Sequence, residues 1–581
     1  MDAIVIGSGP NGLTAAATLA RRGWSVLVLE AQHRPGGACY SEELTLPGYV
    51  HDVGAAFFPF ADDSPAFRDL DLTGAGLEWR NAARESCHPA PDGSCVTISR
   101  DPEQSAISFG EDGPAWRRLA LWRRAMGDRL AAALLGPLPG FGAALRLGPY
   151  HLAWLAREGL GSTASFAVRH FRTEAARRVL PALALHVDLG PDDFAGAGLG
   201  LVLALLASGP GFRIPVGGAR SITHALIRRL EEAGGVLRCS ARAERIVVRG
   251  GRAVAVRTSD GDEIPVGRAV LADVGPLALY HRLLEEIPAT AGMRRRMRHF
   301  RYGWGTFKMD WALSGPVPWT AAEARQSAVV HAGDSVADLR SFTRQVRGGE
   351  LPTNPYLVIG QQSLADPSRA PVGGHTLWAY SRVPSVVEGG WAAQREAFAD
   401  RIERRLEGLA PGFRSLIRAR AIFSPPDLQA MNENLVGGDL GGGSAHIDQQ
   451  LFFRPAFPYF RYRTPVRGLY LASASTHPGA GVHGACGYNA ARFALHDYLA
   501  TRLAKSARRP LIPQNSRRPV GVGHGVEGDV ADELVFDHRH RHSLKTQAGQ
   551  GPLLRDAMTQ TGLVVALDAQ HHRVIGFRQA G

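Results

Sequence analysis

The fold is decided by residues 3–30, which read AIVIGSGPNGLTAAATLARRGWSVLVLE. An apolar run leads into Gly7, Gly9 and Gly12, a helical pattern follows, and a second apolar run ends at Glu30. Strand, glycine turn, helix, strand and acid follow one another as in a unit that binds a dinucleotide, and this context makes an otherwise weak glycine motif specific. The sequence therefore predicts an α/β fold that begins with a Rossmann-like domain.

Each of these residues has a defined task in such a unit. Gly7 permits the tight turn, Gly9 lets a pyrophosphate approach the backbone, and Gly12 lets the helix and strand pack closely. The phosphates then bind the unpaired N–H groups at the start of the helix. Glu30 is placed to accept hydrogen bonds from the ribose hydroxyls.

The chain is strongly basic, with a formal net charge of +12, but its composition argues against a nucleic-acid partner. Lys308, Lys505 and Lys545 are the only lysines, so the basic residues are almost all arginine, as a GC-rich genome favours. The arginines are scattered, whereas a phosphate-binding surface gathers its basic residues on one face. We therefore predict no nucleic-acid partner, and an attraction to anionic membranes stays open.

The cysteine and histidine patterns point to no metal or redox centre. The five cysteines form no C-x-x-C motif, so the sequence predicts neither a zinc site nor a redox dithiol. In His538–His542 arginine alternates with histidine, and those cations would repel a metal ion. We predict no metal site.

Two observations bear on the compartment. The first predicted strand begins at residue 3, which leaves no room for a signal peptide before it. The longest uncharged apolar stretch, residues 194–212, contains five glycines and a proline and is too broken for a membrane span. We expect a cytoplasmic protein whose membrane contact, where it has one, is peripheral.

Composition and periodicity divide the chain into six segments. Short apolar strands and glycine turns mark three segments of a nucleotide domain, and helical or mixed patterns fill the two insertions between them. The nucleotide segments are 1–61, 209–295 and 426–505, the insertions are a helical cap at 62–208 and a sheet at 296–425, and residues 506–581 are a variable, disordered tail with a hairpin pattern at 562–577.

Three separated motifs carry a family resemblance. Gly36-Gly37 follows the opening unit, Pro215-Val216-Gly217-Gly218 opens the second nucleotide segment, and Thr476–Gly484 lies in the third. Together they resemble the FAD-dependent phytoene desaturase and amine oxidase superfamily, and within it the phytoene dehydrogenase-related group. Residues 437–455 and 484–492 are most similar to the branch of the pyridine nucleotide-disulfide oxidoreductase domain-containing protein 2. The resemblance covers about residues 1–503.

This resemblance implies a glutathione-reductase-type FAD domain with an inserted mixed α+β substrate domain. Val247 would meet the adenine, and Gly479, Gly481 and Val482 would run beside the isoalloxazine ring. Val482 would begin a helix whose positive end stabilises the reduced flavin. The cofactor-binding residues that the motifs imply are Gly7, Gly9, Pro10, Asn11, Gly12, Glu30, Arg34, Gly36, Gly37, Val247, Gly479, Gly481 and Val482.

The resemblance also implies an activity, the oxidation of a small apolar substrate such as a carotenoid or another isoprenoid by hydride transfer to flavin N5. Residues 472–475 lack the acid that some amine oxidases carry before the flavin motif, which favours the desaturase side. Amine oxidation remains an alternative, as does a non-catalytic protein that binds prenyl or lipid groups. The Arg-rich helical region 116–182 is consistent with an entry port at a membrane surface and equally with ordinary amphipathic helices that pack on the core. The sequence does not set the oligomeric state.

Lys308, His477 and His483 are the candidate catalytic residues. Lys308 is the only lysine in the first 500 positions and lies in an alternating strand pattern. A compact ammonium there can hold a water near flavin N5, and the alternative is a strand lysine that pairs with Asp310 or faces solvent. His477 and His483 flank the flavin motif, where each can act as an acid or base or simply brace the loop.

Overall fold

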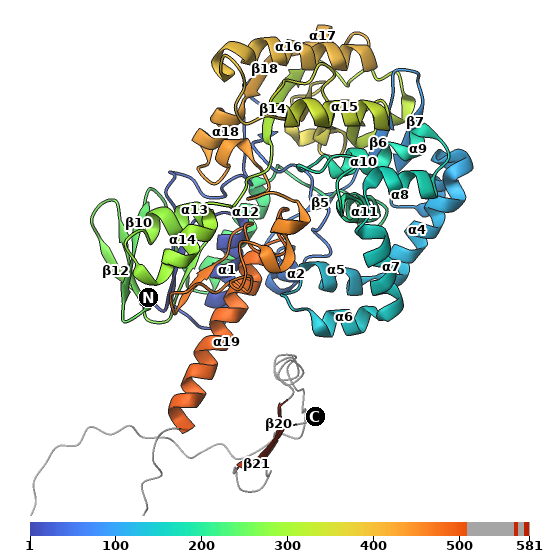
Figure 1. The fold of residues 1–581 in the computed structure, drawn as a ribbon. Coiled ribbons are helices and arrows are strands. Elements are labelled where there is room, and N and C mark those ends of the chain that lie inside the picture. Colours follow the sequence, from blue (N-terminus) through green and yellow to red (C-terminus); the bar gives the residue numbers. More distant parts are fainter. Residues whose placement is uncertain (508–562, 568–573, 580–581) are drawn as a thin grey trace, which may run out of the picture. The chain divides into compact units, whose positions relative to one another are not determined.

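The computed structural model describes residues 1–507, 563–567 and 574–579 (Figure 1). Residues 1–499 form one compact unit and residues 500–581 a second. The second unit contains the antiparallel hairpin of β20 (Leu563–Leu567) and β21 (Val574–Gln579), at the place where the sequence predicts one. His538–His542 and most of the predicted tail lie outside the described residues.

A parallel sheet forms the nucleotide domain. Its five strands stand in the order β19-β13-β1-β2-β9, and they come from all three predicted nucleotide segments. The four-residue strands β1, β2 and β13 are buried along their whole length, as expected for strands covered on both faces. The strands are β1 (Ala3–Ile6), β2 (Val26–Leu29), β9 (Val236–Arg238), β13 (Ala269–Ala272) and β19 (Leu469–Leu471).

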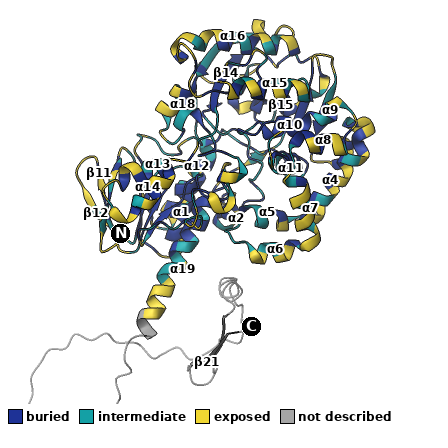
Figure 2. Cartoon of the chain, viewed as in Figure 1, coloured by how far each residue is buried: buried dark blue, intermediate teal, exposed yellow. Residues whose placement is uncertain are grey.

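Helix α1 (Pro10–Ala20) packs between this sheet and α12 (Arg220–Glu232). Alanines and leucines dominate α1, and ten of its residues are buried, so Figure 2 draws it dark along its length. A three-stranded antiparallel sheet of β10 (Ala243–Arg249), β11 (Arg252–Thr258) and β12 (Glu263–Pro265) covers the other side. The predicted Rossmann-like α/β fold is confirmed.

A seven-stranded mixed sheet forms the substrate domain, in the order β18-β14-β17-β16-β15-β6-β7. Two of its strands come from the segment predicted to be a helical cap, because β6 pairs in parallel with β15. The sequence of these two strands has no periodic apolar pattern. Their place in the sheet is set by pairing with β15, which lies far away in the sequence. The strands are β6 (Arg84–Pro89), β7 (Cys95–Ile98), β14 (Gly305–Leu313), β15 (Ser327–Ala332), β16 (Leu357–Gly360), β17 (His375–Val383) and β18 (Ile417–Phe423).

Short helices make up most of residues 102–207. The helical pattern at 115–134 is split in two by Gly127, whose φ of 49° no helix can continue through. None of the described helices is long and apolar enough to cross a membrane. The helices here are α3 (Pro102–Ser108), α4 (Gly113–Met126), α5 (Asp128–Leu135), α6 (Phe141–Leu147), α7 (Pro149–Gly159), α8 (Thr163–His170), α9 (Glu174–Arg177), α10 (Val179–Ala184) and α11 (Gly196–Ala207).

The remaining elements flank the two large sheets or join the segments. Short strand pairs link β3 (Ser41–Glu42) to β4 (His51–Asp52) and β5 (Trp79–Arg80) to β8 (Ile214–Pro215). The remaining helices are α2 (Pro65–Leu70), α13 (Pro276–Ala278), α14 (Ala291–Met297), α15 (Val336–Arg347), α16 (Trp391–Leu409), α17 (Phe413–Leu416), α18 (Pro425–Met431) and α19 (Ala485–Ala507).

The hairpin of β6 and β7 brings two cysteines together that the sequence spacing did not pair. The sulfur atoms of Cys87 and Cys95 lie 2.8 Å apart, because the register of the hairpin places the two residues diagonally opposite each other. Neither residue lines the cavity described below. Two thiols therefore lie side by side although the sequence contains no C-x-x-C motif.

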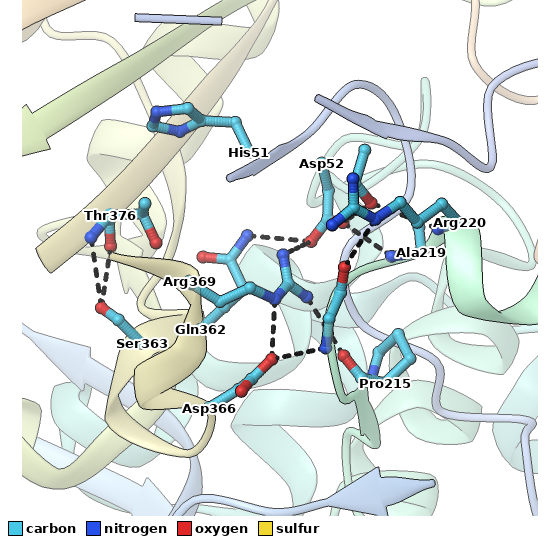
Figure 3. Close-up of polar contacts among 12 residues, drawn as sticks. His51, Asp52, Pro215, Ala219, Arg220, Gln362, Ser363, Asp366, Arg369 and Thr376 are labelled. Atoms are coloured by element: carbon cyan, nitrogen blue, oxygen red, sulfur yellow. Dashed lines mark hydrogen bonds and ion pairs between the residues drawn. The ribbon is translucent and has the colours of Figure 1, made fainter. Parts of the chain in front are cut away.

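A buried guanidinium joins the nucleotide domain to the substrate domain (Figure 3). Arg369 is fully buried and donates to Asp52 Oδ2 at 3.1 Å, to Asp366 Oδ2 at 2.9 Å and to the carbonyl of Pro215 at 3.2 Å. Asp52 also accepts from the Ala219 N–H at 2.8 Å. One side chain therefore ties together segments 1–61, 209–295 and 296–425.

We expect Arg369→Met to lower the free energy of unfolding by about 3–5 kcal/mol, because it leaves two buried carboxylates without their cation. Urea unfolding followed by circular dichroism measures the change. The control is Asp192→Asn, which breaks an exposed ion pair with Arg340 and should cost less than about 1 kcal/mol. Equal stabilities of the two variants would contradict the role given to Arg369.

Candidate active site

One cavity runs from the glycine turn of the nucleotide domain to the seven-stranded sheet. At the nucleotide end its wall contains Gly7, Gly9 and Glu30. At the other end the wall is made by side chains of α11 and of strands β15, β16 and β17. The glycine turn and the large sheet thus border one continuous space.

The glycine turn leaves room that a side chain would fill. A Cβ atom on Gly9 would lie 2.7 Å from Asp273 Oδ2, and one on Gly12 would lie 2.2 Å from the Gly7 carbonyl oxygen. Asp273 follows β13 directly and accepts a hydrogen bond from the Gly12 N–H at 2.8 Å. The side-chain-free turn at the start of α1 therefore fits the close approach of a dinucleotide phosphate.

Glu30 lies at the end of β2 and lines the cavity, where the sequence predicts the ribose-binding acid. Its Oε2 accepts from the Ser8 N–H at 2.8 Å and from the Ser8 hydroxyl at 2.6 Å, and its Oε1 accepts from the Gln32 N–H at 2.8 Å. These bonds fix the carboxylate at the edge of the glycine turn, so the residue is held in place before any ligand binds.

The structure separates the other predicted FAD contacts into two groups. Pro10, Asn11 and Gly37 line the cavity with Gly7, Gly9 and Glu30. Gly12, Gly36, Arg34 and Val247 do not. Gly36 lies against Thr223, and Arg34 pairs with Glu42 and stacks on Tyr40. Near Val247, the cavity wall is made by Ala243, the first residue of the same strand, and by Arg242 just before it.

The C-terminal motif reaches the cavity through Ala480, Gly481 and Val482. Gly479 lies behind them, against the guanidinium of Arg454. Helix α19 does not begin at Val482, as the sequence predicts, but at Ala485. The reason is backbone geometry: Gly481 has a φ of 117° and Gly484 a φ of 65°, and a right-handed helix cannot pass through either.

His477 and His483 lie in this loop but outside the cavity wall. His483 Nδ1 accepts from the N–H of Ala485, and its carbonyl accepts from the Ser64 hydroxyl at 2.6 Å. The carbonyl of His477 accepts from the Tyr462 hydroxyl at 2.8 Å. Burial lowers the pKa of both rings to about 4, so both are neutral at pH 7. These contacts are those of loop-bracing residues, and a catalytic role for either remains a prediction.

Lys308 lies in β14 and forms a buried ion pair with Asp310, the alternative that the sequence analysis left open. Burial raises the pKa of Asp310 to about 6, and the ammonium of Lys308 opposes that rise. Lys308 pairs across the sheet with Tyr380, so both side chains lie on the same face, but only Tyr380 lines the cavity. A role for Lys308 beside the flavin remains a prediction.

Sequence reasoning missed several residues of the cavity wall. Asp273 could have been predicted from the sequence, because it follows the carboxyl end of a buried strand, where ligands of such folds bind. Asn432, Glu433 and Asn434 could not have been, since they come from an irregular segment after α18. The substrate end was missed as well, and its wall consists of His186, Leu199, Leu203, Phe212, Val329, Val358, Trp378 and Tyr380.

The chain is similar to several known proteins. Residues 5–71 match the model of an NAD(P)-binding Rossmann-like domain. The pyridine nucleotide-disulfide oxidoreductase domain-containing protein 2 of Mus musculus is 26% identical over 85% of this chain and 93% of its own length. A neurosporene-forming phytoene desaturase of Rhodobacter capsulatus is 25% identical over 83% of this chain and 91% of its own. A solved structure of a putrescine oxidase mutant aligns with a TM-score of 0.54 and 17% identity, over 86% of this chain and 99% of its own.

The raised pKa of the Asp273 carboxyl predicts that the stability of the protein depends on pH. Burial raises the pKa of this carboxyl from 3.8 to about 7, and the N–H of Gly12 opposes the rise. Between these values the folded protein binds one more proton than the unfolded chain, so its stability should fall by up to about 1.4 kcal/mol per pH unit as pH rises.

Asp273→Asn should remove this slope while keeping an acceptor for Gly12. Urea midpoints of the FAD-free proteins at pH 5, 6, 7 and 8 measure it, with the difference between wild type and variant isolating this one group. Asp192→Asn, which changes an exposed acid, serves as the control. Curves for wild type and Asp273→Asn that run parallel across this range would show that the carboxyl is not perturbed.

Proposed function

We propose that this chain, an FAD-dependent oxidoreductase of the superfamily that includes phytoene desaturases and amine oxidases, dehydrogenates an apolar substrate of the isoprenoid type. The relatives found by comparison agree with the superfamily, the oxidoreductase class and the FAD cofactor that the sequence analysis predicted. The observation that carries the proposal is the single cavity that connects the glycine turn to an apolar chamber.

FAD, when bound, supplies the chemistry by accepting a hydride from a substrate C–H bond at its N5 atom. The residues that would hold it are Gly7, Gly9, Glu30 and Gly37 at the nucleotide end, with Gly481 and its neighbours in the C-terminal motif. The chain itself contributes a shaped space, which aligns a C–H bond and keeps water away from it.

The far half of the cavity suits an apolar molecule. Leu199 and Leu203 of α11, Val329 and Val358 of the large sheet, and Phe212 all line this space. Such a lining favours hydrocarbon by about 25 cal/mol for each square ångström removed from water. A dehydrogenation there needs no strong base, and none of the ionisable residues lining this half is acidic.

The same lining weakens the amine alternative. An ammonium group brought into an apolar space needs a carboxylate partner. The carboxylates in the cavity wall are Glu30, Asp273 and Glu433, and all three lie at the nucleotide end. Glu433 is already paired with Arg242 and Arg282.

The proposal is tested by an anaerobic visible spectrum of the FAD-loaded protein, titrated with phytoene in detergent and then with shorter isoprenoids. We expect the oxidised flavin bands to bleach in proportion to added substrate. An oxidised spectrum that persists through the series, but bleaches with amines, would favour the amine alternative. A protein that binds these ligands without any bleaching would favour the non-catalytic alternative.

We also propose that the protein contacts membranes peripherally, through the consecutive helices α6 and α7. Phe141, Leu145 and Tyr150 are 78%, 83% and 73% exposed there. Arg146 and Arg157 are exposed in the same two helices. Exposed aromatic and aliphatic side chains beside arginines bind the interface of an anionic bilayer, from which an apolar substrate can be taken up.

The double variant Phe141→Ser with Leu145→Ser should reduce co-sedimentation with phosphatidylcholine vesicles that contain phosphatidylglycerol by about tenfold, because two anchoring side chains are lost. Val386→Ser, which removes an exposed apolar residue in a loop far along the chain, is the matched control. Equal binding of the double variant and the control would exclude helices α6 and α7 as the contact.

A further inference from the structure

His186 brings a polar ring into the apolar half of the cavity. It follows α10, is half-buried, and lines the cavity together with Tyr380. The two rings stand perpendicular to each other with centroids 6.2 Å apart. Tyr380 is held by stacking on Trp378 at 5.7 Å.

A chain of hydrogen bonds holds His186 from behind. Its Nε2 lies 2.8 Å from His331 Nε2, and His331 Nδ1 lies 3.0 Å from the Ser86 hydroxyl. That hydroxyl also lies 2.9 Å from His88 Nε2, and the rings of His88 and His331 stack at 4.7 Å. Strands β6 and β15 supply these partners, so the ring of His186 is anchored to the large sheet.

The histidine chain is uncharged at neutral pH. Burial lowers the pKa of His186 to about 4 and that of His88 to about 3, and it also lowers the pKa of His331. A neutral imidazole carries one N–H donor and one acceptor nitrogen. With Nε2 of His186 engaged by His331, its Nδ1 is the ring atom left to interact with a ligand.

Two polar atoms in this half of the cavity lack partners. Neither His186 Nδ1 nor the Tyr380 hydroxyl makes a hydrogen bond to any residue in the described part of the chain. Burying such groups against a hydrocarbon costs free energy, since their bonds to water are not replaced. Cavities that bind small molecules instead use a few convergent polar groups to orient a polar atom of the ligand.

We propose that the substrate is an isoprenoid that carries a hydroxyl group, and that His186 and Tyr380 bind this hydroxyl. The proposal rests on the proposed dehydrogenation and names its substrate class. A hydroxyl both donates and accepts, so it matches either tautomer of His186 and the phenol of Tyr380. A cation would find no carboxylate beside these two residues, and a pure hydrocarbon would leave both unpartnered.

His331 and Ser86 are positioning residues in this arrangement. They touch His186 directly or through one another and do not line the cavity. Their role is to fix the tautomer and orientation of the ring that meets the hydroxyl.

The test compares two ligands that differ by one oxygen atom: farnesol and the hydrocarbon with a methyl group in place of its CH₂OH. Binding to the FAD-loaded protein is followed without oxygen by quenching of tryptophan fluorescence. We expect wild type to bind farnesol about tenfold more tightly than the hydrocarbon, since only the alcohol satisfies the two polar atoms.

His186→Phe and Tyr380→Phe should each reduce this preference, because farnesol loses a hydrogen-bond partner and the hydrocarbon no longer leaves that polar atom unpartnered. Tyr380→Phe removes a single oxygen and keeps the ring, so it tests the proposal even where the His186 variant fails to fold. His331→Leu should reduce the preference in part. Leu199→Val is the control, because an apolar trim should weaken both ligands alike and keep their ratio.

The proposal is overturned if wild type does not bind farnesol more tightly than the hydrocarbon, or if both phenylalanine variants keep the preference. The flavin spectrum, recorded in the same samples, separates this result from the proposed reaction. A preference for farnesol without bleaching would contradict dehydrogenation and support the hydroxyl site. Bleaching by the hydrocarbon without a preference for farnesol would do the reverse.

Discussion

The arrangement of the two domains depends on one buried cation, Arg369. It pairs with Asp52 and Asp366 and bonds the backbone of Pro215, so three segments distant in sequence meet at one side chain. A buried ion pair adds little net stability compared with an apolar contact of the same shape, but losing one partner is costly. The network therefore favours one arrangement of the nucleotide sheet and the large sheet. In that arrangement the cavity between them is continuous.

That cavity has two ends of different chemistry. At the nucleotide end, Gly7 and Gly9 leave room for the phosphates of a dinucleotide because they have no side chain. The carboxylate of Glu30 is held where the ribose would lie. At the far end, leucines and valines surround the rings of His186 and Tyr380. The first end fits a dinucleotide in general. The second end selects the substrate, because an apolar wall accepts many hydrocarbons, whereas a pair of unpartnered polar atoms discriminates strongly between ligands with and without an oxygen.

The sequence predicted the nucleotide end well, for a local reason. The glycine turn, α1 and β2 are contiguous, and their function requires backbone geometry that only particular residues adopt. Glu30 could thus be placed within the site from its distance along the chain alone. The predicted helix start at Val482 was wrong by three residues, because two glycines with positive φ intervene before Ala485. Lys308 looked exceptional as a lone lysine, but the structure pairs it with Asp310, two residues away on the same strand.

By itself the sequence determined the Rossmann-like opening, because that motif is contiguous and its geometry is local. FAD and the oxidoreductase class were implied by the family resemblance of three separated motifs. Only the tertiary structure decided which side chains form the substrate end. His186 follows a helix, His331 and Ser86 lie on strands β15 and β6, and Tyr380 lies on β17, so no spacing in the sequence relates them. They meet because β6 crosses from the segment predicted as a helical cap into the large sheet. Pairing between distant strands depends on burial and register over the whole domain, which no local pattern records.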